Sequence, residues 1–528
     1  MVPDTRTAVP RHVVDLHGFR PVVALVGLIA ALTALLGACS SNDASSGTDK
    51  DSPDSTDPVE SSGAGMRSVV FDGGDDDIDT FRIPGAVTSS AGTILVFAEA
   101  RSESPHDLDP RRIVVRRSTD AGATWGPIIP IVDPSVDPEC DHTDPTPVGP
   151  TVGDGADDVL VLFRSCGQLG SSRSSDDGVS WSDRENLDFK STGDLTDDVA
   201  GRLRSGPAHG IELTTGDAAG RLVFSTDITQ GGETLTQLIL SDDGGLSWRI
   251  GAHHRSDDAA GPNPDETAIT ELVDGTILLS ARNGSADTPG RIQMRSTDGG
   301  ETFADQDGQV MVIASELTVP VVQGSLLTEP TSGLAIFSSP SDPVYRRGPR
   351  LWTSSDGNDW ELGPLLSQNP AAYSDLVALP DGDNSAVGVI VETGDRGLYE
   401  RIEFVRIPVP ELTDGPFENL EDDFDVAGAV SGRVVVDGTS FEIIEYCIGA
   451  ERMELDGGWI EPDLSAGLDD VGFRAHLDDR GDGTPLDLDG RAQLELESGI
   501  RFRGQVADLE GVAHDVDLVM VNMEPCPG

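Results

Sequence analysis

A short phrase built from Ser, Asp and Gly and closed by an aromatic residue recurs along the chain, and it restricts the fold more than any other feature. The phrase reads STDAGATW from Ser118, SSDDGVSW from Ser174, SDDGGLSW from Ser241 and STDGGETF from Ser296, and a shorter form, SSDGNDW, begins at Ser354. The starts lie 56, 67, 55 and 58 residues apart, a spacing that suits four-stranded blades better than single hairpins. The repeat therefore predicts a β-propeller.

The chemistry of the phrase is that of a tight turn between two strands. Its Asp can accept backbone N–H groups, its Gly can adopt positive φ, and its terminal aromatic residue can pack onto the blade. A calcium site is the alternative interpretation, but the phrase lacks the consecutive carboxylate ligands at EF-hand spacing. Segments such as RIVVRR, VLVLFRS and TILLSAR recur between these turns and favour an all-β fold.

The length of the chain indicates more than one unit, because 528 residues exceed an ordinary compact domain. Dividing residues 66–411 by the repeat spacing gives about six blades. Residues 412–528 lack the phrase but still alternate polar and apolar residues, as in SGRVVVDGTSFEIIEYC, so we expect a separate small β-domain. Within it, DDRGDGTPLDLDG resembles an EF-hand loop, but Arg480 stands where a ligand is needed and a surface turn is favoured.

The first 39 residues have the pattern of an export signal. Arg6, Arg11 and Arg20 precede the apolar run PVVALVGLIAALTALLGAC, which ends in small residues. The tetrad ending at Cys39, Leu-Gly-Ala-Cys, resembles a bacterial lipobox, which implies a lipid-modified Cys39 and a membrane anchor. An uncleaved anchor helix is the alternative, although the run is short for a span. Both interpretations place the rest of the chain outside the cytoplasm, and the Ser-, Asp- and Gly-rich residues 40–65 are expected to form a flexible linker.

Net charge and cysteine content narrow the partners and the compartment. With 36 Lys and Arg against 93 Asp and Glu, the formal net charge is −57, which argues against binding to nucleic acid. Apart from Cys39, the chain has four cysteines, an even number that suits an oxidising compartment. Proximity in the sequence favours two disulfides, Cys140 with Cys166 and Cys447 with Cys526.

One arginine stands out in the stretch DTFRIPGAV, which leads into the hydrophobic run GTILVFAEAR. A buried strand has little use for Arg82, because an unpaired buried charge costs several kcal/mol. The repeated phrases look like the Asp-boxes of sialidases, and FRIP resembles the arginine-bearing motif in the first blade of that family. The resemblance covers residues 66–411 and implies a six-bladed propeller with no cofactor and no metal. The small β-domain expected from the alternating pattern would follow this propeller.

The same resemblance implies a cluster of three arginines that binds the carboxylate of a sugar acid. Arginine suits this task because it is permanently charged, planar and able to bind a carboxylate through two hydrogen bonds. Arg82 is the first member, and Arg282, in NPDETAITELVDGTILLSARN, is the second. The third is Arg346, in DPVYRRGPRLW, with Arg347 as its alternative.

The resemblance also implies the groups that carry the chemistry. Tyr373, in AAYSDLVALPDG, matches the nucleophile, and Glu266, in NPDETAI, matches the base that takes its proton. A tyrosine nucleophile avoids the like-charge repulsion that a carboxylate would meet at a carbon bearing a carboxylate. Asp107, in the loop EARSESPHDLDPRRIVV, matches the general acid, and Asp109 is the alternative.

Three further residues match supporting positions of the family. Glu392, in GVIVETG, resembles the glutamate that orients the first arginine, although Val391 stands where an aromatic residue is usual. Asp144, in HTDPTP, resembles an aspartate that contacts substrate, and Arg101 is expected to brace the loop of the acid. The segment GPAHGIEL from Gly206 also resembles a family segment.

Together, these matches imply an extracellular, lipid-anchored exo-sialidase that acts on sialylated glycans with retention. Within enzymes, the alternatives are a hydrolase of related 2-keto-3-deoxy sugar acids and a trans-sialidase, since both would keep the same residues. A glycan-binding propeller without activity is the alternative from another class, because Asp-boxes also occur in non-enzymes.

Overall fold

The computed structural model describes residues 65–420 and the strands between residues 428 and 525, with short gaps. The gaps before residue 421 are 103–110, 133–139, 150–156, 190–202, 231–232, 257–261, 284–289, 305–308, 344–345, 396 and 416. Some of the sequence predictions lie outside the described residues: the export signal and linker, and the roles of Cys39, Asp107, Asp109, Cys447, Arg480 and Cys526.

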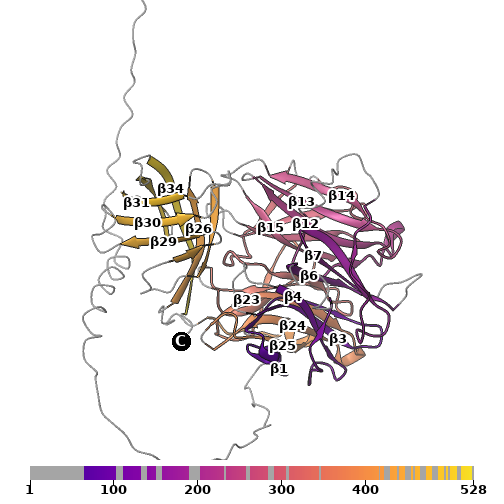
Figure 1. Cartoon of the computed structure of the whole chain (residues 1–528). Helices are drawn as coiled ribbons and strands as arrows, with labels where there is room; N and C mark the ends of the chain where they lie inside the picture. The colour runs from indigo at the N-terminus through magenta and orange to yellow at the C-terminus, as the bar shows by residue number, and fades with distance from the viewer. Residues whose placement is uncertain are drawn as a thin grey trace, which may run out of the picture. The chain divides into compact units, whose positions relative to one another are not determined.

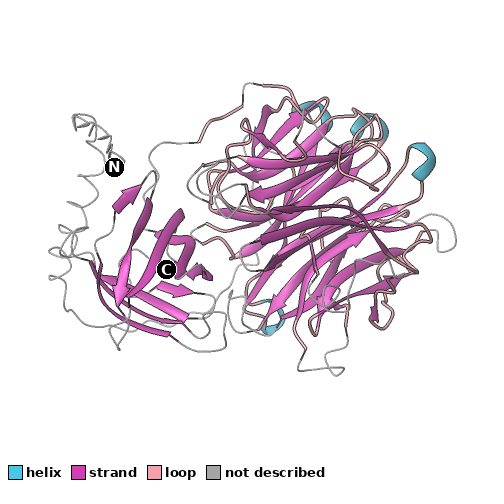
Figure 2. Cartoon of the chain, turned by 90° about the horizontal axis from the view of Figure 1, so that it is seen from above, coloured by secondary structure: helices cyan, strands magenta, loops and turns pink. Residues whose placement is uncertain are grey.

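Strands dominate the described residues, as the sequence pattern predicts (Figure 2). The helical segments among them are short 3-10 turns: η1 (Asp75–Asp77), η2 (Gly216–Ala218), η3 (Gly382–Asn384) and η4 (Val409–Leu412). In this described part, no helix has the length and apolar character to cross a membrane.

Six antiparallel sheets form the six blades of a β-propeller (Figure 1), which confirms the predicted fold. Blade 1 contains β2 (Thr80–Thr88), β3 (Ile94–Arg101), β4 (Arg111–Ser118) and β5 (Ile129–Pro130). Blade 2 contains β6 (His142–Val148), β7 (Val159–Ser165), β8 (Gln168–Ser174) and β9 (Glu185–Asn186). Blade 3 contains β10 (Arg204–Ser205), β11 (Ile211–Glu212), β12 (Leu222–Gln230), β13 (Glu233–Ser241) and β14 (Arg249–Ser256).

The remaining blades follow the same plan. Blade 4 contains β15 (Pro264–Glu271), β16 (Ile277–Asn283), β17 (Arg291–Ser296) and β18 (Val312–Ala314). Blade 5 contains β19 (Ser325–Thr328), β20 (Ala335–Pro340), β21 (Pro349–Ser354) and β22 (Glu361–Leu365). Blade 6 combines β23 (Ala371–Leu379), β24 (Ala386–Thr393) and β25 (Arg401–Pro408) with β1 (Arg67–Asp72), which comes from the start of the propeller.

Blade 6 closes the ring because its outer strand and its inner strands come from opposite ends of the propeller sequence. β1 pairs antiparallel with β25, with Arg67 opposite Val405 and Asp72 opposite Arg401. This pairing gives the outer edge of β25 a partner and joins residues more than 300 positions apart.

A nine-stranded antiparallel sheet forms the C-terminal part of the chain. Its strands lie in the order β31, β30, β29, β28, β27, β26, β34, β33, β32. The bounds are β26 (Gly428–Val436), β27 (Thr439–Glu445), β28 (Met453–Leu455), β29 (Gly458–Asp463), β30 (Val471–Leu477), β31 (Leu486–Ala492), β32 (Glu495–Glu497), β33 (Ile500–Ala507) and β34 (Ala513–Pro525). These strands pair with one another and with none of the described propeller strands.

The apolar core of the propeller lies between neighbouring blades. Phe97 of β3 packs in one cluster with Val161 and Phe163 of β7, so blade 1 packs against blade 2. The other face of β3 packs against blade 6, where Ala98 shares a cluster with Phe404. All eight residues of β3 are therefore buried, which explains why its sequence is an apolar run rather than an alternating pattern.

The repeated phrases form the tight turns that the sequence predicts. In each of the five, the Ser hydroxyl accepts the N–H of the Gly three or four residues later, at 2.8–3.0 Å. The Asp carboxylate accepts a backbone N–H at the end of the turn, from Thr124, Ser180, Ser247, Thr302 or Asn358. Each phrase thus satisfies its own backbone.

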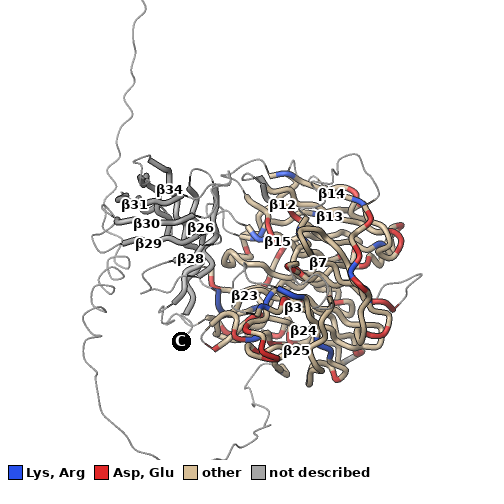
Figure 3. The backbone as a smooth tube through the Cα atoms, in the orientation of Figure 1, with Lys and Arg blue, Asp and Glu red and all other residues tan. Residues whose placement is uncertain are grey.

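Charged side chains also join neighbouring blades. Arg117 of blade 1 lies 2.6 Å from Asp177 in the repeat of blade 2, and Arg221 of blade 3 lies 2.9 Å from Glu301 in the repeat of blade 4. Figure 3 shows Asp and Glu in many turns of the propeller, in keeping with the acidic composition. A disulfide between Cys140 and Cys166, with Cα atoms 4.9 Å apart, ties the start of β6 to the turn after β7.

We predict that Gly122→Ala destabilises the propeller far more than Gly92→Ala. Both glycines have positive φ, 89° and 83°, so each substitution carries a strain of about 1 kcal/mol. A Cβ at Gly122 would also overlap the ring of Phe404 in blade 6, whereas a Cβ at Gly92 meets open space. Urea unfolding should show a loss of about 3 kcal/mol or more for Gly122→Ala and about 1 kcal/mol for Gly92→Ala. Equal losses would contradict this packing of the repeat.

Candidate active site

Inner strands of four blades carry β-bulges, and the candidate residues lie at them. The pairing register shifts between Arg82 and Gly85 in β2, between Thr143 and Thr146 in β6, between Asp265 and Thr267 in β15, and between Ala371 and Ser374 in β23. Three non-glycine residues at these bulges have positive φ: Ile83 at 55°, Asp144 at 57° and Glu266 at 41°. A bulge redirects side chains, and such backbone strain is common at functional sites.

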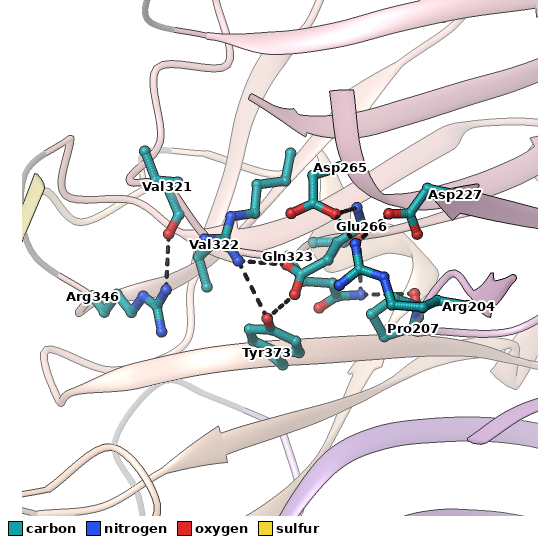
Figure 4. A network of polar contacts seen from close by, with 12 residues as sticks. Arg204, Pro207, Asp227, Asp265, Glu266, Val321, Val322, Gln323, Arg346 and Tyr373 are labelled. Atoms are coloured by element: carbon teal, nitrogen blue, oxygen red, sulfur yellow. Dashed lines mark hydrogen bonds and ion pairs between the residues drawn. The ribbon is translucent and has the colours of Figure 1, made fainter. Parts of the chain in front are cut away.

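Tyr373 and Glu266 form the centre of the site, although 107 residues separate them in sequence. The Tyr373 hydroxyl donates a short hydrogen bond to Glu266 Oε1 (Figure 4). Arg282 Nη1 donates to Glu266 Oε2 at 2.9 Å and lies 3.4 Å from the Tyr373 hydroxyl. The three residues predicted as nucleophile, base and second arginine are thus in direct contact.

Glu392 connects the first arginine to the backbone of the tyrosine. Its Oε1 accepts the N–H of Ile83 at 2.7 Å and lies 3.4 Å from Arg82 Nε, while its Oε2 accepts the N–H of Tyr373 at 3.0 Å. Glu392 is fully buried. A buried carboxylate with this many donors fixes the position of both segments, as the sequence prediction for Glu392 requires.

Arg346 and its neighbour Arg347 have different surroundings. Arg346 donates to the Tyr399 hydroxyl at 3.3 Å and to the Val321 carbonyl at 2.9 Å. Figure 4 shows the contact of Arg346 with Val321. Arg347 forms a buried ion pair with Asp342 at 2.9 Å. The geometry therefore favours Arg346 as the third arginine.

Tyr399 is a site residue that the sequence analysis missed. The Arg82 guanidinium lies 4.0 Å from the centre of its ring, a cation–π contact, and its hydroxyl accepts a hydrogen bond from Arg346. Tyr399 thus contacts two of the three arginines. The scarcity of tyrosine was the available signal, because the chain has only 4.

The site collects positive charge inside a strongly acidic protein. Arg82, Arg282 and Arg346 are only 6%, 8% and 8% exposed. Glu392 lies 3.4 Å from Arg82 and Glu266 lies 2.9 Å from Arg282, so these two carboxylates compensate part of the buried positive charge. Such a set is suited to bind an anion.

The environment of Tyr373 keeps its hydroxyl protonated until a base acts on it. Burial raises its pKa well above the usual value, and the negative charge of Glu266 raises it further, while the three arginines lower it. A phenol in this state needs a base in contact with its hydroxyl in order to react as a nucleophile. Glu266 meets that requirement, since it already accepts the hydrogen bond.

Asp144 and Arg101 lie in a neighbouring cluster and share the partner Glu99. Arg101 is fully buried and pairs with Glu99 Oε2 at 2.7 Å. The N–H of Asp144 donates to Glu99 Oε1 at 2.8 Å. Burial and the charge of Glu99 raise the pKa of Asp144 to about 7. Within the described residues, no group of three or more His, Cys, Asp or Glu side chains is arranged to hold a metal ion.

We predict that Asp144→Asn becomes more stable relative to the wild type as the pH rises from about 4 to about 7. Folding raises the pKa of Asp144 from 3.8 to about 7, so between these pH values the carboxyl ionises in the unfolded chain but stays protonated in the folded protein. The wild type therefore loses stability as the pH rises through this range. Asn cannot ionise and escapes this loss. Because Asp144 is partly exposed, the expected relative gain is on the order of 1 to 2 kcal/mol.

Asp177→Asn is the matched control because its pKa shift has the opposite sign. Burial alone would raise the pKa of Asp177, but hydrogen bonds from Ser89, Thr93 and Arg117 lower it. This variant should therefore lose stability relative to the wild type above about pH 4. Denaturant unfolding at a series of pH values measures the free energy of unfolding of both variants. If this free energy changes with pH in the same way for Asp144→Asn and the wild type, the pKa of Asp144 is not raised by its surroundings.

Comparison with known proteins shows that the chain is similar to sialidases. It is 29% identical over 347 residues to a sialidase of Micromonospora viridifaciens, a match that covers 60% of this chain and 50% of that protein. It is 27% identical over 366 residues to a sialidase of Bacteroides fragilis (strain YCH46), covering 63% of this chain and 62% of that protein. The chain thus spans about half to three fifths of the length of these curated relatives.

Solved structures agree on the fold, and a family model covers most of the propeller. The Hadza microbial sialidase Hz136 superposes with a TM-score of 0.53 at 24% identity, over 66% of this chain and 69% of that one. The model of the BNR repeat-like domain matches residues 92–385, which is more than half of the chain. This protein therefore belongs to the BNR repeat-like family, together with the bacterial sialidases that it resembles.

Proposed function

We propose that this chain is an exo-α-sialidase that removes terminal sialic acids from glycans with retention of configuration. The contact of the Tyr373 hydroxyl with Glu266, beside Arg82, Arg282 and Arg346, is the observation that carries the proposal. The arginines would bind the carboxylate of the sugar, which places its anomeric carbon near the tyrosine. The sialidases among the relatives support this substrate class.

In the first half of the proposed reaction, the Tyr373 oxygen attacks C2 of the sugar while Glu266 takes the phenolic proton. The C2–Tyr bond forms as the bond from C2 to the leaving oxygen breaks, and a general acid gives that oxygen a proton. Asp107 is proposed for this role, with Asp109 as the alternative. The attacking phenol begins neutral, so it approaches the sugar carboxylate without the repulsion that a second carboxylate would meet.

In the second half, water replaces the tyrosine at C2. The residue that acted as acid takes a proton from the water, the C2–Tyr bond breaks, and Glu266 returns its proton to the phenolate. Two displacements at C2 leave the sugar with its original configuration. All groups are then ready for the next substrate.

We also propose that the protein is exported and anchored to the membrane by lipid on Cys39. The arginines before the apolar run and the small residues that precede Cys39 support this proposal. An extracellular location would give the site access to glycans on cell surfaces and secreted proteins.

The decisive experiment is covalent labelling with a 2,3-difluoro sialic acid. Its fluoride at C2 leaves without help from an acid, and its second fluorine slows release of the adduct. We predict that peptide mass mapping of the full chain finds one sugar unit on Tyr373 and that Tyr373→Phe abolishes labelling. Asp107→Ala should still be labelled, because that step does not need the acid.

Tyr399→Phe serves as the matched control, because Tyr399 is a second tyrosine of the same site that contacts two arginines. Its adduct should remain on Tyr373. An adduct on a carboxylate, or no adduct with an enzyme that hydrolyses a fluorogenic sialoside, would refute the tyrosyl mechanism. Absence of both labelling and hydrolysis would refute the proposed activity.

A further inference from the structure

Glu266 has a backbone conformation that something outside its own strand must hold. Its φ of 41° lies in the left-handed region, which is unfavourable for a glutamate in the middle of a strand. The bulge at Asp265 to Thr267 turns the Glu266 side chain toward Tyr373. A relaxed backbone at this point would move the carboxylate away from the phenol.

Asp265 supports this turn directly. Its Oδ1 accepts the N–H of Glu266 at 2.9 Å, so the side chain before the base closes onto the backbone of the base. The same oxygen also accepts a hydrogen bond from Arg204 Nη2 at 2.8 Å. Asp265 is therefore shared between the turn of blade 4 and a residue of blade 3.

Arg204 joins two carboxylates on neighbouring blades. Its Nη2 lies 2.5 Å from Asp227 Oδ2 in β12 and 2.8 Å from Asp265 Oδ1 in β15, and Figure 4 shows it between the two side chains. Asp227 is almost fully buried. Burial raises the pKa of Asp227 well above its usual value, whereas the pKa of Asp265 falls to about 2 because Arg204 and Arg282 outweigh burial. Asp265 thus stays ionised as the partner of Arg204.

The segment that carries Arg204 is itself anchored on its other side. Ser205 Oγ donates to the carbonyl of Asp144 at 2.7 Å, and Thr146 Oγ1 donates to the carbonyl of Gly206 at 2.9 Å. The two-residue strand β10 therefore contacts the strained turns of both blade 2 and blade 4. An arginine on this anchored segment has a fixed point from which to hold Asp265.

We propose that Arg204 is a positioning residue for the base: by holding Asp265 against Asp227, it fixes the left-handed turn that aims the Glu266 carboxylate at the Tyr373 hydroxyl. This inference rests on the proposed function of Glu266 and Tyr373. Arg204 acts through Asp265, and its contribution is geometric rather than chemical.

The test compares Arg204→Met with Arg117→Met in the full-length protein. Arg117 is the matched control, because it also forms an ion pair between two blades, with Asp177 at 2.6 Å. The rate of labelling by the 2,3-difluoro analogue isolates the attack of Tyr373, and hydrolysis of a fluorogenic sialoside gives kcat and KM. We expect Arg204→Met to slow labelling and lower kcat on the order of 10- to 100-fold, with KM little changed. Arg117→Met should label at the wild-type rate.

Arg204→Lys and Asp227→Ala separate positioning from simple loss of stability. Lysine keeps the positive charge, so Arg204→Lys should recover part of the rate lost in Arg204→Met. The recovery should be incomplete because lysine lacks the planar guanidinium that can contact both carboxylates. Asp227→Ala, which removes both oxygens that can accept from Arg204, should slow labelling while thermal unfolding shows a folded protein. If Arg204→Met does not fold, these two variants decide the question.

The outcomes distinguish this inference from the function on which it rests. Wild-type labelling on Tyr373 together with wild-type rates in the Arg204 and Asp227 variants would overturn the positioning role and leave the proposed function intact. A rise in KM without a fall in kcat would also overturn it, because that result indicates substrate binding by Arg204. A wild type that is neither labelled nor active would refute the proposed function itself.

Discussion

Three arginine side chains lie buried near one another at the centre of the propeller, and their charges repel one another. The site is organised around this constraint. Arg82, Arg282 and Arg346 are each at most 8% exposed, so water screens their charges poorly. Glu392 and Glu266 each lie against one of them, and Tyr399 contacts two. Three arginines at one place can attract an anion locally, although the protein as a whole has a net charge of −57.

Strained β-bulges bring the side chains of the site together. A regular strand would place alternate side chains between the blades, where the apolar clusters lie. Bulges in β2, β6, β15 and β23 interrupt that alternation beside Ile83, Asp144, Glu266 and Tyr373. The strain is tolerated because buried hydrogen bonds hold each turn, for example those of Glu392 to Ile83 and of Asp265 to Glu266.

The sequence predicts the propeller well because the signal is local and repeated. Each turn phrase carries its own Ser, Asp and Gly contacts within about eight residues, so the pattern survives without knowledge of the rest of the fold. The predicted contact between Tyr373 and Glu266 also agrees with the geometry, but it came from resemblance to a family. Nothing in the local sequence brings together residues that are 107 positions apart.

Other parts of the site could not be predicted, for a related reason. Two adjacent arginines, Arg346 and Arg347, are equivalent in sequence and differ only in three-dimensional partners, Tyr399 for one and Asp342 for the other. Arg204 lies about sixty residues from Asp265 and belongs to another blade, so its contact has no local pattern. Asp107 lies outside the described residues, and its role as acid stays a prediction.

The most direct test of carboxylate binding by the three arginines is a crystal structure of the protein with a 2,3-dehydro sialic acid, an inhibitor that keeps the sugar carboxylate. We predict that this carboxylate lies within hydrogen-bond distance of Arg82, Arg282 and Arg346, with C2 facing the Tyr373 hydroxyl. A sugar bound with its carboxylate turned away from the three arginines, or bound at another part of the propeller, would contradict it.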